Sequence, residues 1–290
     1  MATNALALRH PLHLSTGLEE RVESALRSAV ARASLGSPPR LREALAYAVF
    51  PGGGRLRPRL CLTVAAACGE RAPGRAEAAA VGVELVHCAS LVHDDMPCFD
   101  DASLRRGRPT VHKAFGEPTA LLVGDALIVM AFEALGRAGA AAELAELATA
   151  SGPARGIIAG QAWEGEAAVP LDEYQRAKTA SLFEAAAAMG AMAAGADPEP
   201  WRAFGEGVGR AYQAADDLAD ALATAERTGK TTGRDAALGR PSIVRAYGVE
   251  VAKRRVKELV AQACASLPAC RDASVVHAWV AGLAQKLELS

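Results

Sequence analysis

Apolar residues recur at helical spacing along nearly the whole chain, and strand-like alternation of apolar and polar residues is nearly absent. No Asn-Gly or Asp-Gly pair separates two β-branched runs, as a tight hairpin would favour. The pattern predicts helices near residues 16–35, 41–50, 58–68, 75–95, 118–136, 140–150, 154–164, 172–193, 198–223, 241–247, 249–266 and 273–287. Connections are short except for two polar, basic segments at about 96–117 and 224–240. We therefore predict an all-α fold with a single domain over residues 1–290, an orthogonal bundle of about a dozen helices.

The composition argues against a nucleic-acid-binding protein and against an integral membrane protein. The chain has 32 basic and 33 acidic residues, and this balance gives no reason to expect a nucleic acid as partner. No uncharged apolar run reaches the roughly 20 residues of a membrane span, so we do not expect an integral membrane protein. The six cysteines form no Cys-x-x-Cys pair, which is typical of free thiols in a reducing compartment such as the cytoplasm.

Two aspartate clusters interrupt otherwise apolar helices. They are Asp94, Asp95, Asp100 and Asp101, and Asp216, Asp217 and Asp220. Asp216 and Asp220 lie one turn apart on one helix face, where like charges repel unless water or cations neutralise them. A solvated helix turn would explain either cluster alone. Two clusters in apolar helices instead favour Mg²⁺, which binds a few carboxylates and completes its shell with waters and phosphates.

Basic residues accompany the aspartates. Arg105, Arg106 and Arg108 follow the first cluster, and Lys230, Arg234 and Arg240 follow the second. A third group, Arg55, Arg57 and Arg59, follows the Gly52-Gly53-Gly54 turn and opens a helix, where free N–H groups and arginines favour an anion. Paired carboxylates with several arginines together indicate a site for a Mg²⁺-diphosphate.

From about Leu41 to Pro241 the chain resembles the trans-prenyl diphosphate synthases. The motifs occur in family order: Gly53-Gly-Arg-Leu-Arg-Pro58, His87-Cys-Ala-Ser-Leu-Val-His-Asp-Asp95, Arg105-Arg106-Gly107, Gly124-Asp-Ala-Leu127, Gly160-Gln161, Lys178-Thr179, Tyr212-Gln213-Ala-Ala-Asp-Asp217 and Gly229-Lys230. The first aspartate motif looks most like those of bacterial and plastid geranylgeranyl diphosphate synthases. The resemblance implies an isoprenoid synthase fold with a central substrate cavity. One departure stands out, because the family normally carries Lys where this chain has Gly54.

The resemblance also implies a reaction, the Mg²⁺-dependent head-to-tail condensation of isopentenyl diphosphate with an allylic diphosphate (dimethylallyl, geranyl or farnesyl). It implies that the metal is held by Asp94, Asp95, Asp100, Asp216, Asp217 and Asp220. The allylic diphosphate would contact Arg105, Lys178 and Lys230, and isopentenyl diphosphate would contact Arg57, His87 and Arg106 beside Gly54. Thr179 and Gln213 would lie near the reacting carbons, and Gln161 in the metal-water shell or against the diphosphate. A homodimer is the family expectation.

Small residues before the first aspartates bear on product length. Ala89 and Ser90 stand where farnesyl synthases that resemble this chain carry an aromatic residue, so we expect the twenty-carbon geranylgeranyl diphosphate, with a farnesyl diphosphate synthase as the alternative. A terpene cyclase or head-to-head synthase is a further alternative, but those enzymes lack the Gly-Gly-x-Arg-x-Arg-Pro turn. The last alternative is a non-catalytic regulatory subunit of a heteromeric synthase, and Gly54 is the feature in its favour.

Overall fold

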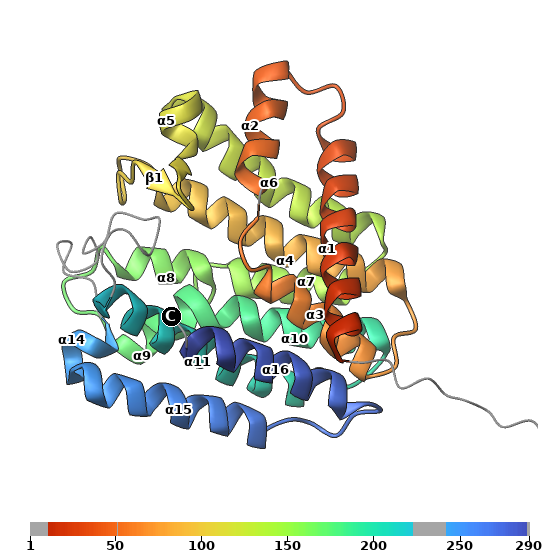
Figure 1. Cartoon of the computed structure of the whole chain (residues 1–290). Coiled ribbons are helices and arrows are strands. Elements are labelled where there is room, and N and C mark those ends of the chain that lie inside the picture. Colours follow the sequence, from red (N-terminus) through yellow and green to blue (C-terminus); the bar gives the residue numbers. More distant parts are fainter. Residues whose placement is uncertain (1–10, 51, 223–241, 289–290) are drawn as a thin grey trace, which may run out of the picture.

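The computed structural model describes residues 11–50, 52–222 and 242–288, and within these residues the fold is all-α apart from one small hairpin (Figure 1). The elements, in chain order, are α1 (Pro11–Ala33), α2 (Pro39–Val49), α3 (Leu56–Ala67), α4 (Pro73–Asp94), β1 (Leu104–Arg105), β2 (Arg108–Pro109), α5 (Val111–Phe115), α6 (Glu117–Arg137), α7 (Ala141–Ser151), α8 (Ile157–Trp163), α9 (Leu171–Gln175), the π-helical turn η1 (Arg176–Ala180), α10 (Ser181–Ala194), α11 (Glu199–Leu222), α14 (Ile243–Tyr247), α15 (Val249–Ala265) and α16 (Ala273–Glu288).

Helix α10 forms the centre of the bundle and packs against α3, α4, α7 and α11. Nearly all its residues are buried, and most are Ala or Gly. A Cβ on Gly190 would lie 2.3 Å from the carbonyl oxygen of Cys61 in α3. A Cβ on Gly205 of α11 would lie 2.5 Å from the carbonyl oxygen of Phe183. Small residues therefore let three helix backbones touch, which explains a core rich in alanine.

Helix α4 carries the first aspartate cluster and packs along α6 (Figure 1). A Cβ on Gly124 of α6 would lie 2.0 Å from Nε2 of His93, so the His93 ring lies directly against that glycine. Among the described helices, α6 is long and apolar enough to cross a membrane. Because its inner face is buried against α4, α6 equally fits the core helix of a globular bundle.

Most of the predicted helices are confirmed, with differences at three places. Helix α1 begins at Pro11 rather than near residue 16, since proline is well suited to a first helical position. The segment 172–193 is interrupted by η1. The segment 96–117 contains α5 and the hairpin, in which Arg105 pairs with Arg108 in antiparallel register. The second basic segment, 224–240, lies outside the described residues.

The hairpin turns through Arg106 and Gly107, which both have positive φ angles, 54° and 73°. Two such residues are what a tight type I′ connection requires, and Asn-Gly usually supplies them. An arginine in the left-handed region is uncommon and strained. The hairpin was missing from the sequence prediction because its turn uses an unfavourable residue.

Candidate active site

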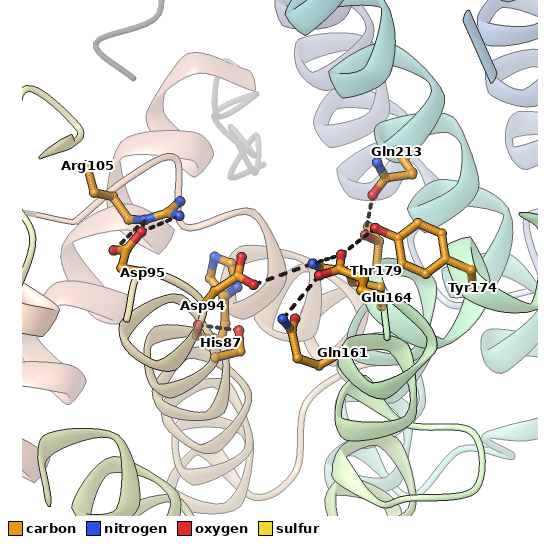
Figure 2. A network of polar contacts seen from close by, with 11 residues as sticks. His87, Asp94, Asp95, Arg105, Gln161, Glu164, Tyr174, Thr179 and Gln213 are labelled. Carbon is orange, nitrogen blue, oxygen red and sulfur yellow. Dashed lines mark hydrogen bonds and ion pairs between the residues drawn. The ribbon is translucent and has the colours of Figure 1, made fainter. Parts of the chain in front are cut away.

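The first aspartate cluster lies where α4 ends. The Asp95 carboxylate is buried and accepts hydrogen bonds from Nε of Arg105 at 2.8 Å to each oxygen (Figure 2). Burial raises the pKa of the Asp95 carboxyl above its ordinary value, and the hydrogen bonds from Arg105 only partly oppose this. The main-chain N–H of Asp100 bonds the carbonyl of Asp94 at 2.9 Å, which folds the buried Asp100 back toward the helix end.

Asp94 differs from Asp95 because one of its carboxylate oxygens lacks a donor. Its Oδ1 is buried without a hydrogen-bond partner, and Nζ of Lys178 lies 3.5 Å away. A buried, unsatisfied carboxylate oxygen fits a cation ligand. Within the described residues no three Asp, Glu, His or Cys side chains already form a metal cage. This suits Mg²⁺, which is bound through one or two carboxylates together with waters and substrate phosphates.

Lys178 and Thr179 share the π-helical turn η1, a feature often found at functional sites. The side chain of Lys178 extends toward α4, whereas Oγ1 of Thr179 hydrogen-bonds Oε1 of Gln213 in α11. A Cβ on Gly160 would lie 2.4 Å from Cα of Lys178, and one on Gly209 would lie 2.6 Å from Cα of Ala180. The main chain of η1 therefore packs closely against two glycines, one from α8 and one from α11.

The second aspartate cluster continues the same polar path. Nε2 of Gln213 donates to Oδ1 of Asp217 at 2.6 Å. Oδ2 of Asp217 accepts from Nε2 of Gln175 at 3.0 Å and from the main-chain N–H of Ile243, the first residue of α14, at 2.8 Å. Asp216 and Asp220 are half-buried on the same helix. Contacts thus run from Asp94 through η1 and Gln213 to Asp217, and they connect the two aspartate clusters.

Several arginines gather around His87 of α4. Arg57 is buried, and its guanidinium carbon lies 4.5 Å from the ring centroid of Phe183. Its Nε has no hydrogen-bond partner, and burial lowers its pKa. Burial, followed by the charges of Arg57 and Arg106, lowers the pKa of the His87 imidazole well below its ordinary value.

The glycine turn and the hairpin meet at Arg106. A Cβ on Gly53 would lie 2.7 Å from an Nη atom of Arg106, so that guanidinium rests on the glycine main chain. The charges of Arg57 and Arg106 act on His87, so the three residues that the resemblance assigns to isopentenyl diphosphate lie near one another. Lys230, Arg234 and Arg240, predicted for the second basic segment, lie outside the described residues.

Two arginines after the glycine turn form ion pairs with glutamates of other elements. Arg55 is buried with a φ of 48°, and it pairs with Glu23 and Glu84 at 2.7 Å each. Arg59 pairs with Glu19. The sequence grouped Arg55, Arg57 and Arg59 as candidate anion contacts, and of these Arg55 and Arg59 form ion pairs with glutamates of the fold.

The remaining predicted residues are placed as follows. Gly54 is exposed and does not adopt a positive φ, and a Cβ there would lie 3.5 Å from Cγ of Leu56, an ordinary contact. Ala89 is fully buried in the core, and Oγ of Ser90 bonds the carbonyl of His87 at 2.8 Å.

Glu164 and Tyr174 were missing from the sequence prediction. The Glu164 carboxylate accepts hydrogen bonds from the Tyr174 hydroxyl, Lys178 and Gln161, so it lies inside the site (Figure 2). Gln175, which bonds Asp217, was missing as well. A signal existed for Glu164, because it follows Gln161 by three residues and so shares its helix face.

Comparisons with known proteins show the family to which the chain belongs. Residues 38–276 match the polyprenyl synthetase family. The chain belongs to the polyprenyl synthetase family. It is 52% identical to the geranylgeranyl diphosphate synthase of Cereibacter sphaeroides, over 93% of this chain and 96% of that protein. It is 48% identical to the geranylgeranyl diphosphate synthase of Rhodobacter capsulatus, over 87% and 90% of the two chains.

Solved structures of similar proteins have the same fold. The geranyltransferase of Helicobacter pylori, crystallised with magnesium and isoprenyl diphosphate, matches with a TM-score of 0.80 and 28% identity, covering 100% of both chains. The geranylgeranyl pyrophosphate synthetase of Pyrococcus horikoshii matches with a TM-score of 0.79 and 28% identity, over 95% of this chain and 98% of that one. The isoprenoid synthase fold predicted from the sequence is thereby confirmed for this polyprenyl synthetase.

Proposed function

We propose that this polyprenyl synthetase condenses isopentenyl diphosphate head to tail with an allylic diphosphate, in a Mg²⁺-dependent reaction that ends at geranylgeranyl diphosphate. The observation that carries the proposal is the polar path from Asp94 through Lys178 and Thr179 to Gln213 (Figure 2). The path continues from Gln213 to Asp217, so it connects the two aspartate helices. The names of the Cereibacter and Rhodobacter relatives support the twenty-carbon product.

The metal site is proposed to use both aspartate clusters: Asp94, Asp95 and Asp100 from one, and Asp216, Asp217 and Asp220 from the other. Asp94 has the strongest support, because its buried Oδ1 lacks a donor. Mg²⁺ bound there would neutralise the charge that grows on the allylic diphosphate as its C–O bond breaks. The magnesium in the Helicobacter structure agrees with this role.

The allylic diphosphate is proposed to lie against Arg105 and Lys178, with Lys230 contributing from outside the described residues. Cations fixed before the reaction stabilise the departing diphosphate more than the bound substrate, so they lower the barrier. The Thr179 hydroxyl and the Gln213 amide bond each other beside Lys178. These neutral dipoles would stabilise an allylic cation without trapping it as a strong nucleophile would.

Isopentenyl diphosphate is proposed to bind Arg57, His87 and Arg106. The lowered pKa of His87 keeps its ring neutral, so it can donate one hydrogen bond to a phosphate oxygen while the arginines supply the charge. The double bond of this substrate then attacks the allylic carbon. Proton loss to the departed diphosphate completes the step, and the primer is dimethylallyl, geranyl or farnesyl diphosphate.

We also propose a cytoplasmic homodimer. The six cysteines are free thiols, which suits a reducing compartment. The outer face of α6 exposes Leu121, Leu122 and Val129, and a second copy of the chain would cover them. Light scattering would report twice the chain mass, and a combined Leu122→Glu and Val129→Glu variant would halve it. A monomeric wild-type protein would contradict the dimer.

The decisive experiment incubates the purified protein alone with Mg²⁺, isopentenyl diphosphate and each allylic diphosphate in turn. We expect geranylgeranyl diphosphate, and none after chelation of the metal. Product that stops at fifteen carbons would identify a farnesyl synthase. Loss of diphosphate without chain growth would identify a cyclase. Activity that needs a second protein would identify a regulatory subunit.

A further inference from the structure

Glu164 lies at the end of α8 and is held from two sides (Figure 2). The Tyr174 hydroxyl of α9 donates to its Oε1 at 2.7 Å, and Nε2 of Gln161 donates to its Oε2 at 3.2 Å. The Glu164 side chain is 10% exposed, and Tyr174 is buried. These contacts fix the position of the carboxylate independently of Lys178.

Lys178 lies between two carboxylates. Its Nζ bonds Oε1 of Glu164 and lies 3.5 Å from Oδ1 of Asp94, without a hydrogen bond to that oxygen. A lysine ammonium is a compact charge on a flexible stem, so it can move toward either partner. The attraction to Asp94 grows as the distance shortens, and most strongly in a partly buried site. The contact with Glu164 opposes that movement.

We propose that Tyr174 is a positioning residue that fixes Glu164, and that Glu164 thereby holds the ammonium of Lys178 away from Asp94. The inference rests on the proposed function, in which Asp94 receives Mg²⁺. If Lys178 were hydrogen-bonded to Asp94, that bond would have to break before the metal could bind. Glu164 would therefore keep the Lys178 ammonium at ion-pair distance from Asp94 without a hydrogen bond to the oxygen that is proposed to bind the metal.

Tyr174→Phe tests the inference because it removes one hydroxyl and leaves every charge in place. Calorimetry would follow Mg²⁺ binding to the protein in the presence of inorganic diphosphate. We expect the affinity for Mg²⁺ to fall by about three- to tenfold, which is the range that the loss of one typical net hydrogen bond predicts. Turnover at saturating Mg²⁺ should change much less. Tyr247→Phe, which alters an exposed tyrosine on α14, is the matched control.

A double-mutant cycle separates this role from a general structural one. In a Lys178→Ala background, Tyr174→Phe should cause no further loss of Mg²⁺ affinity. An equal loss in both backgrounds, or an unchanged affinity in the wild-type background, would overturn the inference. If circular dichroism shows that Tyr174→Phe does not fold, Glu164→Asp enters the same cycle, because its shorter carboxylate withdraws from Lys178.

The wild-type protein separates the two proposals. If it neither binds Mg²⁺ with diphosphate nor condenses substrates, the proposed function fails, and this inference fails with it. If it does both and the cycle shows no coupling between Tyr174 and Lys178, only the positioning role is wrong.

Discussion

The guanidinium of Arg57 stacks over the ring of Phe183 in the interior, 4.5 Å from the ring centroid. The stack fixes the plane of the cation, and its Nε has no hydrogen-bond partner. A phosphate would therefore meet a guanidinium that is already oriented.

Arg57→Lys should raise the KM for isopentenyl diphosphate by about tenfold or more, because lysine neither stacks flat nor binds an anion in a bidentate manner. Arg59→Lys is the matched control, since Arg59 pairs with Glu19 and a lysine keeps that charge. Steady-state kinetics decide the point. Equal KM values for the two variants would exclude Arg57 from the diphosphate site.

Gly54→Lys should restore the cation that the family normally carries. The position is exposed, its φ is not positive and a Cβ fits, so the variant should fold. A charge-assisted contact stabilises binding by ~1.5–3 kcal/mol, so we expect at least about a tenfold lower KM for isopentenyl diphosphate and little change for the allylic substrate. Gly54→Gln, which adds length without charge, should not reproduce the gain. An unchanged KM in Gly54→Lys would mean that another cation already serves this place.

Asp94→Asn and Asp217→Asn should differ in their effect on stability. Both should lose most turnover. Asp94→Asn should leave the melting temperature near that of wild type, because Oδ1 of Asp94 has no donor to lose. Asp217 accepts bonds from Gln213, Gln175 and the main chain of Ile243, so Asp217→Asn should cost roughly 1–3 kcal/mol of unfolding free energy. Thermal melts with activity assays test this. Near-normal turnover in Asp94→Asn would remove it from the metal site.

His87 should make stability depend on pH. Its pKa in the folded chain lies well below the ordinary 6.5, so below pH 6.5 the unfolded chain takes up a proton that the folded chain excludes. The unfolding free energy should therefore fall as the pH drops from 7 toward 5. Denaturant titrations of His87→Asn should show a shallower fall, while His277→Asn, at an exposed position, should follow wild type. Parallel curves for wild type and His87→Asn would contradict a lowered pKa of His87 in the folded chain.

Ala89→Tyr should shift the product from twenty to fifteen carbons. Each buried CH₂ of the growing tail is worth about 0.8 kcal/mol, so growth continues until a side chain blocks the path. Ala79→Tyr, at an equally buried position of α4, should cost stability by overpacking and leave the product length unchanged. Product chromatography distinguishes the cases. A wild-type enzyme that already stops at fifteen carbons, or runs well past twenty, would refute the role of Ala89.

Local patterns predicted the helices and missed the two irregular elements. The periodicity of α11 is set by which of its side chains are buried, so the sequence records it directly. No local sequence pattern predicts the π-helical turn η1, because η1 depends on contacts with Gly160 and Gly209 of other helices. The hairpin depends on Arg106 accepting a left-handed conformation that its residue type disfavours.

The sequence predicted those residues of the candidate site that belong to recognisable motifs. The aspartates, Lys178 and Gln213 belong to recognisable motifs. Tyr174 and Gln175 do not, and their partners are brought near by the packing of α8, α9 and α11. Arg55 and Arg57 are two residues apart and chemically alike in the sequence. Only Glu23 and Glu84, distant along the chain, show that Arg55 supports the fold.

The glycines around η1 bear on attempts to make the enzyme heat-resistant. Replacing helical glycine by alanine raises stability where the new methyl group has space, because the unfolded chain loses freedom. Gly136 and Gly282 have that space, since nothing lies within 4 Å of a Cβ at either position. At Gly160 the new methyl group would collide with Lys178, and at Gly209 it would collide with Ala180, so η1 would have to shift. Replacing every helical glycine by alanine would therefore lower turnover, although neither Gly160 nor Gly209 has a side chain that could touch substrate.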